Sequence, residues 1–177
     1  MALYHFSEDP GIRVFEPHVA PTSTQDDALV WAIGDWHAPM YYVPRQCPRA
    51  CFWPGDRTTA EDGERWFGGI EARMVIAVES KWLPAIRETV LYRYTMPDAS
   101  FRLNDATAGH YVSNETVEPL AVEPVGDLLQ ALIDANVELR ITPRLVDLWK
   151  RVIESTLEFS GTRLRNADGW AETFGKT

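Results

Sequence analysis

Short runs of apolar residues, separated by polar and turn-forming residues, divide the chain into strand-like and helix-like segments. The strand-like runs mix aliphatic, β-branched and aromatic residues over five to seven positions and are bounded by turn residues. We therefore predict strands at residues 2–6, 28–33, 74–78, 89–95 and 137–141.

The clearest helical period lies in the C-terminal third. Apolar residues recur there at helical spacing, so that one face of a helix is apolar. Pro124 is suited to start this helix, and Asn136 to end it in a left-handed conformation. The apolar positions are Val125, Leu128, Leu129, Leu132 and Ile133.

A second helix is predicted after the strand at residues 137–141. Thr142 is suited to be its N-cap, and Pro143 can occupy its first position. Its apolar stripe consists of Leu145, Leu148, Trp149, Val152, Ile153 and Leu157.

Two shorter helices are predicted in the first half of the chain. Asp35 can cap a helix over residues 36–42, with Pro39 in its first turn. Ser80 can cap another helix over residues 81–88. Both follow a predicted strand directly.

Loops are predicted at residues 17–27 and at residues 54–69, where polar residues, glycine and proline gather. Several strand-to-strand connections are too short for a helical crossover. This favours an α+β fold with a mixed, mostly antiparallel sheet. No linker or repeat interrupts the chain, so we predict a single domain over residues 1–177.

The net charge of the chain disfavours some classes of binding partner. Its formal net charge is -9, which repels nucleic acid and other polyanions. The sequence begins without a signal-peptide pattern, and no apolar run is long enough to cross a membrane. We therefore expect a cytoplasmic protein without nucleic-acid or membrane partners. The sequence does not indicate a protein partner.

Cys47 and Cys51 are the two cysteines of the chain. A structural zinc site needs about four ligands, and His37 would have to fold back to join them. The spacing leaves a metal site open, but it favours free thiols, and we predict no metal.

His5 and Ser7 lie two residues apart in the first predicted strand. Their side chains then point to one face, and those of Tyr4 and Phe6 to the other. A histidine and a serine in this position either bond to neighbouring backbone or together grip a polar ligand.

The segment Leu3-Tyr4-His5-Phe6-Ser7 resembles the first motif of the ADP-ribosyltransferase superfamily, of the poly-ADP-ribose polymerase and diphtheria-toxin type. This resemblance implies the fold of that superfamily and NAD as the substrate. It also implies that His5 and Ser7 contact the nicotinamide-side ribose and the carboxamide of NAD.

The segment Val30-Trp31-Ala32-Ile33 and the aromatic residues that follow it are similar to the second motif of that superfamily. The resemblance implies Trp31 as the first aromatic residue and Tyr41 or Tyr42 as the one that stacks on nicotinamide. Residues of these types after a strand also serve as core and rim packing.

The third motif of the superfamily carries a catalytic glutamate, and here the sequence departs from it. His110 stands at the corresponding position. A neutral imidazole lacks the charge of a carboxylate. Either Glu115 or Glu118 substitutes for the glutamate, or the chain binds a nucleotide without transferring ADP-ribose.

Arg45 lies in a stiff segment between prolines and is a candidate for a phosphate contact, as are Arg13 and Arg49. The chain also resembles a group of uncharacterised bacterial proteins through Tyr4 to Pro10, Val30 to Ile33, Pro44 to Arg49 and Arg163 to Ala167. We therefore expect an ADP-ribosyltransferase-like domain that binds NAD or a related small nucleotide. A non-catalytic binding module and a protein-interaction domain remain alternatives.

Overall fold

The structure is a computed structural model that describes residues 1–19 and 27–175 of the chain. It forms two compact units. The first is made of Met1–Tyr41 and Val90–Gly126, and the second of Tyr42–Thr89 and Asp127–Thr177. The segments interleave along the sequence, and the prediction of a single domain stays a prediction.

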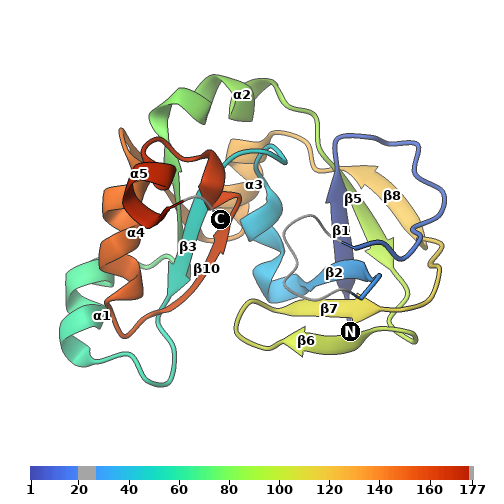
Figure 1. Cartoon of the computed structure of the whole chain (residues 1–177), viewed down its shortest axis with the longest axis horizontal. Coiled ribbons are helices and arrows are strands. Elements are labelled where there is room, and N and C mark those ends of the chain that lie inside the picture. Colours follow the sequence, from blue (N-terminus) through green and yellow to red (C-terminus); the bar gives the residue numbers. More distant parts are fainter. Residues whose placement is uncertain (20–26, 176–177) are drawn as a thin grey trace. The chain divides into compact units, whose positions relative to one another are not determined.

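The first unit contains a six-stranded sheet in the order β6-β7-β2-β1-β5-β8 (Figure 1). All its ladders are antiparallel. A 3-10 helix, η1, follows β2 and covers Asp35–Tyr41. The strands are β1 Leu3–Ser7, β2 Val30–Gly34, β5 Tyr92–Met96, β6 Arg102–Asp105, β7 His110–Ser113 and β8 Ala121–Pro124.

One face of this sheet carries the core of the first unit. Residues that pair across an antiparallel ladder share a face. Leu3 pairs with Met96 and His5 pairs with Tyr94, so these side chains lie on the same face of the sheet. Phe15 and Phe101 pack against the same cluster. The buried members are Leu3, Val30, Ala32, Tyr94, Met96 and Val117.

The second unit contains a four-stranded sheet in the order β10-β3-β4-β9. The β4–β9 pair is parallel, and the other two ladders are antiparallel. The strands are β3 Arg49–Trp53, β4 Met74–Glu79, β9 Val137–Thr142 and β10 Glu158–Thr162. The helices are α1 Ala60–Phe67, η2 Ser80–Trp82, α2 Leu83–Glu88, α3 Leu128–Asp134, α4 Leu145–Ile153, η3 Leu164–Asn166 and α5 Trp170–Phe174.

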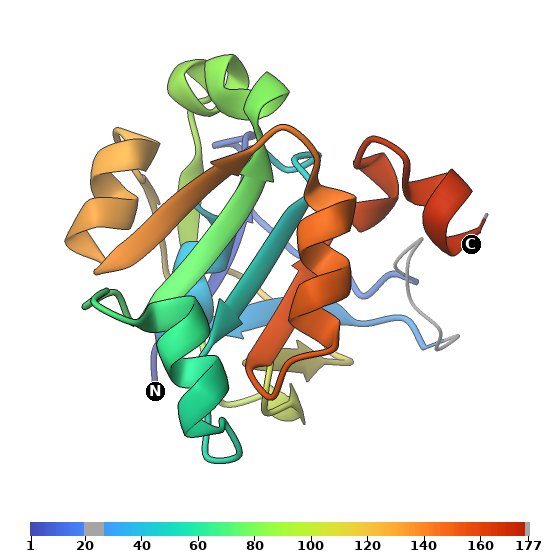
Figure 2. The same cartoon turned by 90° about the vertical axis from the view of Figure 1, so that its left-hand side faces the viewer.

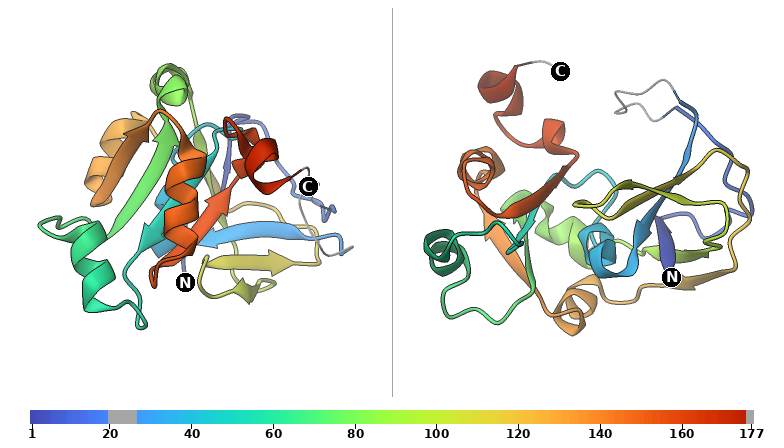
Figure 3. Two further views of the ribbon diagram at one scale, coloured as in Figure 1. Left: turned by 60° about the vertical axis from the view of Figure 1, so that its left-hand side comes forward. Right: turned by 90° about the horizontal axis from the view of Figure 1, so that it is seen from below.

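Helices α1 and α4 cover one face of this sheet. Every residue of β3 and β4 is buried. Figure 2 shows α1 and α4 in front of the strands, and the left panel of Figure 3 shows the same side. The cluster beneath them contains Ala50, Phe52, Trp66, Phe67, Val75, Ala77, Leu145, Val146, Trp149, Val152, Leu157 and Ala167.

The fold class predicted from the sequence is confirmed in its coarse form, α+β with mostly antiparallel sheets. The five predicted strands correspond to β1, β2, β4, β5 and β9. The strands missed are β6 and β8, which are exposed throughout, together with β3, β7 and β10. An exposed strand lacks the alternation of apolar and polar residues that a half-buried strand shows.

The loop predicted at residues 54–69 is wrong in its second half, which forms α1. Thr59 caps this helix, because its side chain accepts a hydrogen bond from the Asp62 backbone N–H. Trp66 and Phe67 are buried and supply its packing face. The other predicted loop, at residues 17–27, lies largely outside the described residues.

The start of the helix at residues 125–133 also differs from the prediction. Pro124 ends β8 instead, and α3 begins at Leu128. Asp127 caps it by accepting hydrogen bonds from the backbone N–H groups of Leu129 and Gln130, at 2.9 and 3.0 Å. The predicted left-handed Asn136 is confirmed, with a φ of 55°.

Thr142 does not cap the following helix, because it is still part of β9. The cap position of α4 is taken by Arg144, whose side chain makes no capping bond. In the predicted stripe, Leu145, Trp149 and Val152 are buried, whereas Ile153 is 39% exposed.

The two shorter helices of the first half are also tighter than predicted. The first is the 3-10 helix η1, Asp35–Tyr41, so the predicted cap Asp35 is instead its first residue, and Pro39 lies inside it. Ser80 is the first residue of η2 and does not cap it, and α2 follows from Leu83. A 3-10 helix at the start of an α-helix is common.

Replacing Thr59 with alanine should lower the free energy of unfolding by about 1 kcal/mol, because the Asp62 N–H loses its capping partner. Thr59→Ser keeps the hydroxyl and is the matched control. Urea unfolding measures both variants. Equal stability of the alanine and serine variants would contradict the capping role.

Candidate functional site

An aromatic patch lies on the face of the six-stranded sheet that is opposite the core of the first unit. Tyr4 pairs with Ile33, and Ile33 pairs with His110, so Tyr4 and His110 share this face. Side chains two residues apart in a strand share a face, so Phe6 lies on this face with Tyr4, and Trp31 lies on it with Ile33. We call the set the aromatic face, and it consists of Tyr4, Phe6, Trp31, Tyr41 and His110.

The rings of the aromatic face form a connected series. Tyr41, at the end of η1, stacks on Phe6 with ring centroids 6.1 Å apart and an interplanar angle of 7°. Tyr41 and Trp31 each meet His110 edge to face, at 6.4 and 5.9 Å. Tyr4 lies 6.4 Å from Phe6. All five side chains are half-buried, so the patch is packed but accessible.

Tyr41 and His110 form the polar centre of this patch. The Tyr41 hydroxyl and His110 Nε2 lie within hydrogen-bond distance, at 3.0 Å. Burial lowers the pKa of His110 below its ordinary value of 6.5, and the nearby Asp105 carboxylate offsets part of that shift. At neutral pH the imidazole is therefore uncharged, and one of its nitrogens donates while the other accepts.

Glycines at the end of β2 and before β7 allow this arrangement. The Gly34 N–H donates to the Gly109 carbonyl at 2.9 Å, which joins the two turns. Gly109 has a φ of 67°, a conformation that other residues rarely adopt. A Cβ atom there would also overlap the His37 ring. Gly109 thus lets η1 approach β7 closely enough for Tyr41 to meet His110.

Asp105 is a site residue that sequence reasoning missed. It pairs with His110 across the β6–β7 ladder, next to a bulge. One of its carboxylate oxygens accepts a hydrogen bond from the Ala108 N–H at 3.0 Å. The local sequence carries no signal for this pairing, because β6 is exposed throughout and shows no apolar alternation.

His5 and Ser7 lie on the opposite face, toward the core. His5 pairs with the buried Tyr94, and its ring lies 4.7 Å from that of Phe15. His5 Nδ1 is 3.0 Å from the carbonyl oxygen of Trp31, where the β1–β2 ladder has ended. The predicted separation of His5 from its neighbours Tyr4 and Phe6 is confirmed. However, His5 does not share a face with the Trp31 side chain.

Ser7 and Tyr94 organise the turn that follows β1. The Ser7 hydroxyl accepts a hydrogen bond from the Asp9 N–H at 3.1 Å, a typical serine turn. The Tyr94 hydroxyl donates to the Asp9 carbonyl at 2.6 Å and accepts from the Ile12 N–H at 3.2 Å. The polar segment after His5 is therefore held against the core by protein contacts.

Glu115 and Glu118 do not join His110. His110 is the first residue of β7, and both glutamates follow Ser113 at the other end of that strand. The length of the strand separates the two ends by about 10 Å. Both glutamates are exposed, and the Glu115 N–H donates to the Ser113 hydroxyl at 3.1 Å.

Tyr42 and Arg45 belong to the second compact unit. Tyr42 is half-buried, and Arg45 is exposed. The expectation that they line one site with His5, Ser7 and Trp31 stays a prediction.

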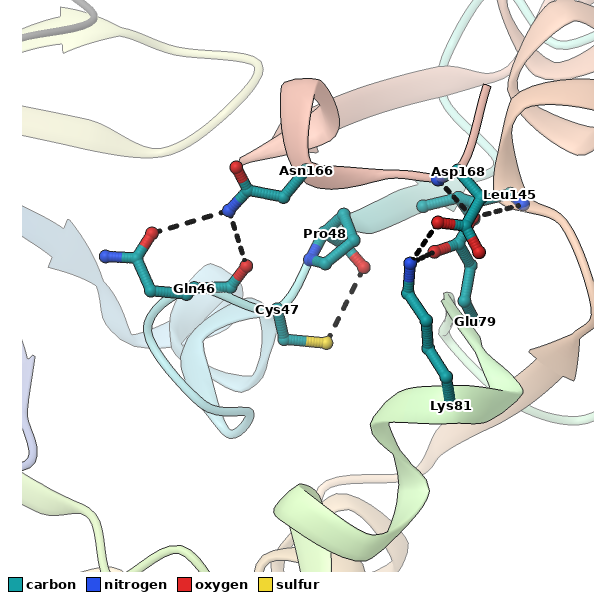
Figure 4. A network of polar contacts seen from close by, with 8 residues as sticks. All are labelled: Gln46, Cys47, Pro48, Glu79, Lys81, Leu145, Asn166 and Asp168. Carbon is teal, nitrogen blue, oxygen red and sulfur yellow. Dashed lines mark hydrogen bonds and ion pairs between the residues drawn. The ribbon is translucent and has the colours of Figure 1, made fainter. Parts of the chain in front are cut away.

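A buried carboxylate forms a second polar cluster, in the second unit (Figure 4). Glu79 is fully buried, and its Oε1 accepts hydrogen bonds from the backbone N–H groups of Leu145 and Asp168, at 3.2 and 2.9 Å. Its Oε2 pairs with Lys81 Nζ at 3.2 Å. Lys81 also pairs with the Asp168 carboxylate. The hydrogen bond to Asp168 is the largest cause that raises the pKa of Lys81.

This cluster joins segments that are distant in sequence. The Leu145 N–H is at the start of α4, so Glu79 does for that helix what a capping side chain would do. The Asn166 side-chain amide donates to the Gln46 carbonyl at 2.8 Å. The contacts of Glu79 and Asn166 hold the segment after β10 against the sheet. They give the buried Glu79 carboxylate a structural role.

Cys47 and Cys51 are free and buried, which confirms the prediction of free thiols. Burial raises the pKa of each thiol to about 12, although the Arg49 guanidinium offsets part of the shift. Both thiols are therefore protonated at neutral pH and are poor nucleophiles. Within residues 1–19 and 27–175, no three His, Cys, Asp or Glu side chains are grouped to hold a metal ion.

The helices of the described segments are short. Among them, none combines the length and the apolar character that crossing a bilayer requires.

Lowering the pH should destabilise the protein through His110. Its pKa is lowered in the folded state, so the unfolded chain takes up the proton first as the pH falls below 6.5. The stability due to neutral His110 is complete above that pH. Below pH 6.5 this stability is lost by at most about 1.4 kcal/mol per pH unit.

Urea unfolding at pH 7.5 and 5.5 measures this effect. His110→Gln should show a smaller loss of stability between the two values than the wild type. His18→Gln is the control, because His18 is exposed in the same unit. If His110→Gln and the wild type lose equal stability, burial of the neutral imidazole is not the cause.

Replacing Glu79 with alanine should destabilise the protein by about 3 kcal/mol or more. Two backbone N–H groups and the Lys81 ammonium lose their common partner. Glu79→Gln keeps one acceptor oxygen and should cost less. Denaturant unfolding measures both variants, and equal losses would show that the backbone contacts do not matter.

Comparison with family models matches residues 4–167 to a family of unknown function, DUF6886. Searches among curated proteins and among solved structures gave no match. These comparisons lend no support to the resemblance to the ADP-ribosyltransferase superfamily. Because the matched segment covers most of the chain, the protein belongs to DUF6886, a family of unknown function.

Proposed function

We propose that the first unit binds NAD or a related nucleotide, with a planar ring of the ligand on the aromatic face. The observation that carries this proposal is the Tyr41–His110 hydrogen bond within a half-buried series of rings. Aromatic rings stack on any nucleobase or nicotinamide, at about 1–3 kcal/mol per ring. The neutral imidazole and the phenol together supply the donor and the acceptor that a carboxamide or base edge needs.

The positions of the acids favour binding over transfer of ADP-ribose. Cleavage of the bond between nicotinamide and ribose needs negative charge near the developing oxocarbenium ion. Glu115 and Glu118 lie beyond the far end of β7, away from His110. Asp105 is the carboxylate paired with His110, and it is the residue we would assign to that role if cleavage occurs.

His5 and Ser7 are not part of the proposed contact surface. His5 contacts the Trp31 carbonyl and Ser7 accepts from the Asp9 N–H, on the core side of the sheet. We infer that they shape the site indirectly. His5 holds the backbone of β2 at Trp31, and Ser7 closes the turn after β1.

Calorimetric titration with NAD, nicotinamide and AMP tests the proposal. Tyr41→Phe removes one hydrogen bond and should weaken binding about 5-fold to 10-fold. His110→Gln should weaken it by a similar factor or more, whereas His18→Gln should leave it unchanged. Circular dichroism confirms that each variant is folded.

Two outcomes would overturn the proposal. One is the absence of binding by all three ligands at millimolar concentration, which would favour a protein-interaction domain. The other is binding that neither Tyr41→Phe nor His110→Gln weakens. Release of nicotinamide from NAD, abolished in Asp105→Asn, would instead show that the unit cleaves the ligand it binds.

A further inference from the structure

A cation lies at one end of the aromatic face. Arg93 in β5 pairs with Phe6 in β1, so its side chain emerges on the same face as Phe6 and Tyr4. Its guanidinium carbon lies 5.0 Å from the centroid of the Tyr4 ring, within the range of a cation–π interaction.

Arg93 continues the series of rings that begins at His110. From Tyr41 the series passes to Phe6 and then to Tyr4, and the guanidinium stands over Tyr4. A base stacked near Tyr41 and Phe6 would therefore have a positive charge one ring farther along the sheet. In a nucleotide, one sugar separates the base from the phosphate, which suits this spacing.

Glu123 is a partner of Arg93 that a phosphate can replace. Arg93 Nε and Nη2 both donate to Glu123 Oε1, at 3.1 and 2.6 Å. The side chains of Arg93 and Glu123 are 33% and 54% exposed. An ion pair this exposed contributes about 0–1 kcal/mol, whereas a guanidinium binds a phosphate with two parallel hydrogen bonds.

Glu123 has two effects on the approach of an anion. It pairs with Arg93 across the β5–β8 ladder and so fixes the guanidinium on the aromatic face. Its negative charge also competes with a phosphate for the same donors. The net charge of -9 adds to that competition, and a local arginine counteracts it for an anionic ligand.

We propose that Arg93 binds the phosphate of the ligand, and that the protein therefore selects nucleoside phosphates over nucleosides and free bases. This inference rests on the proposed function and deepens it. The base lies on the rings next to His110, and the phosphate displaces Glu123 from the Arg93 guanidinium.

The test compares AMP with adenosine, and nicotinamide mononucleotide with nicotinamide riboside, by calorimetric titration. The wild type should bind each phosphate at least about 10-fold more tightly than its nucleoside, and added salt should reduce that preference. Arg93→Gln should abolish the preference, measured as the ratio of AMP to adenosine affinity within the same variant. Glu123→Gln should retain or increase it, because the competing charge is gone.

A variant that keeps the positive charge distinguishes the two parallel hydrogen bonds of the guanidinium from the attraction between unlike charges. Arg93→Lys keeps the charge but cannot make two parallel bonds, so it should keep only part of the preference. The inference is wrong if wild-type protein binds adenosine and AMP equally, or if Arg93→Gln retains the full preference. In either case the proposed function stands as long as His110→Gln weakens nucleoside binding. If no ligand binds the wild type, both proposals fail.

Discussion

The pairing of β1 with β5 is the constraint on which the candidate site depends. Side chains of a strand alternate between faces, and the five residue pairs of this ladder place Leu3, His5 and Ser7 toward the core. The same strand then places Tyr4 and Phe6 on the aromatic face. A shift of register by one residue would exchange the two sets and remove the site. On its other side β1 pairs with β2 for two residues, and beyond them the His5 ring reaches the Trp31 carbonyl.

The elements predictable from sequence are those whose pattern depends on near neighbours. β1 follows from an apolar run before turn residues and α3 from a period of 3.6 residues, and Asn136 follows from the preference of asparagine for a left-handed end. The same rules also separate His5 from Phe6. They do not say which of those two faces becomes the core, because that depends on packing by Phe15 and Tyr94. The pairing of Asp105 with His110 likewise depends on an exposed strand and a bulge that no local pattern marks.

The second unit shows the same limit of local rules in the start of α4. A threonine and a proline before the helix are a good local capping signal, yet Thr142 remains in β9. The Leu145 N–H instead finds Glu79, a residue at the end of β4 that is distant in sequence. Burial of this carboxylate requires compensation, which Lys81 and two backbone N–H groups provide. The charge of Glu79 thus has a structural explanation within its own unit.

The polar pair of the aromatic face, Tyr41 and His110, lies on the side of the sheet away from the core of the first unit. A neutral hydrogen bond such as that between Tyr41 and His110 contributes about 1 kcal/mol to stability. Burial holds the imidazole of His110 neutral on the face away from the core. The role of His5 differs from that of His110. The His5 ring contacts the Trp31 carbonyl where the β1–β2 ladder has ended. A donor and an acceptor among stacked rings, with Arg93 beyond them, support the proposed recognition of a polar, planar and anionic ligand.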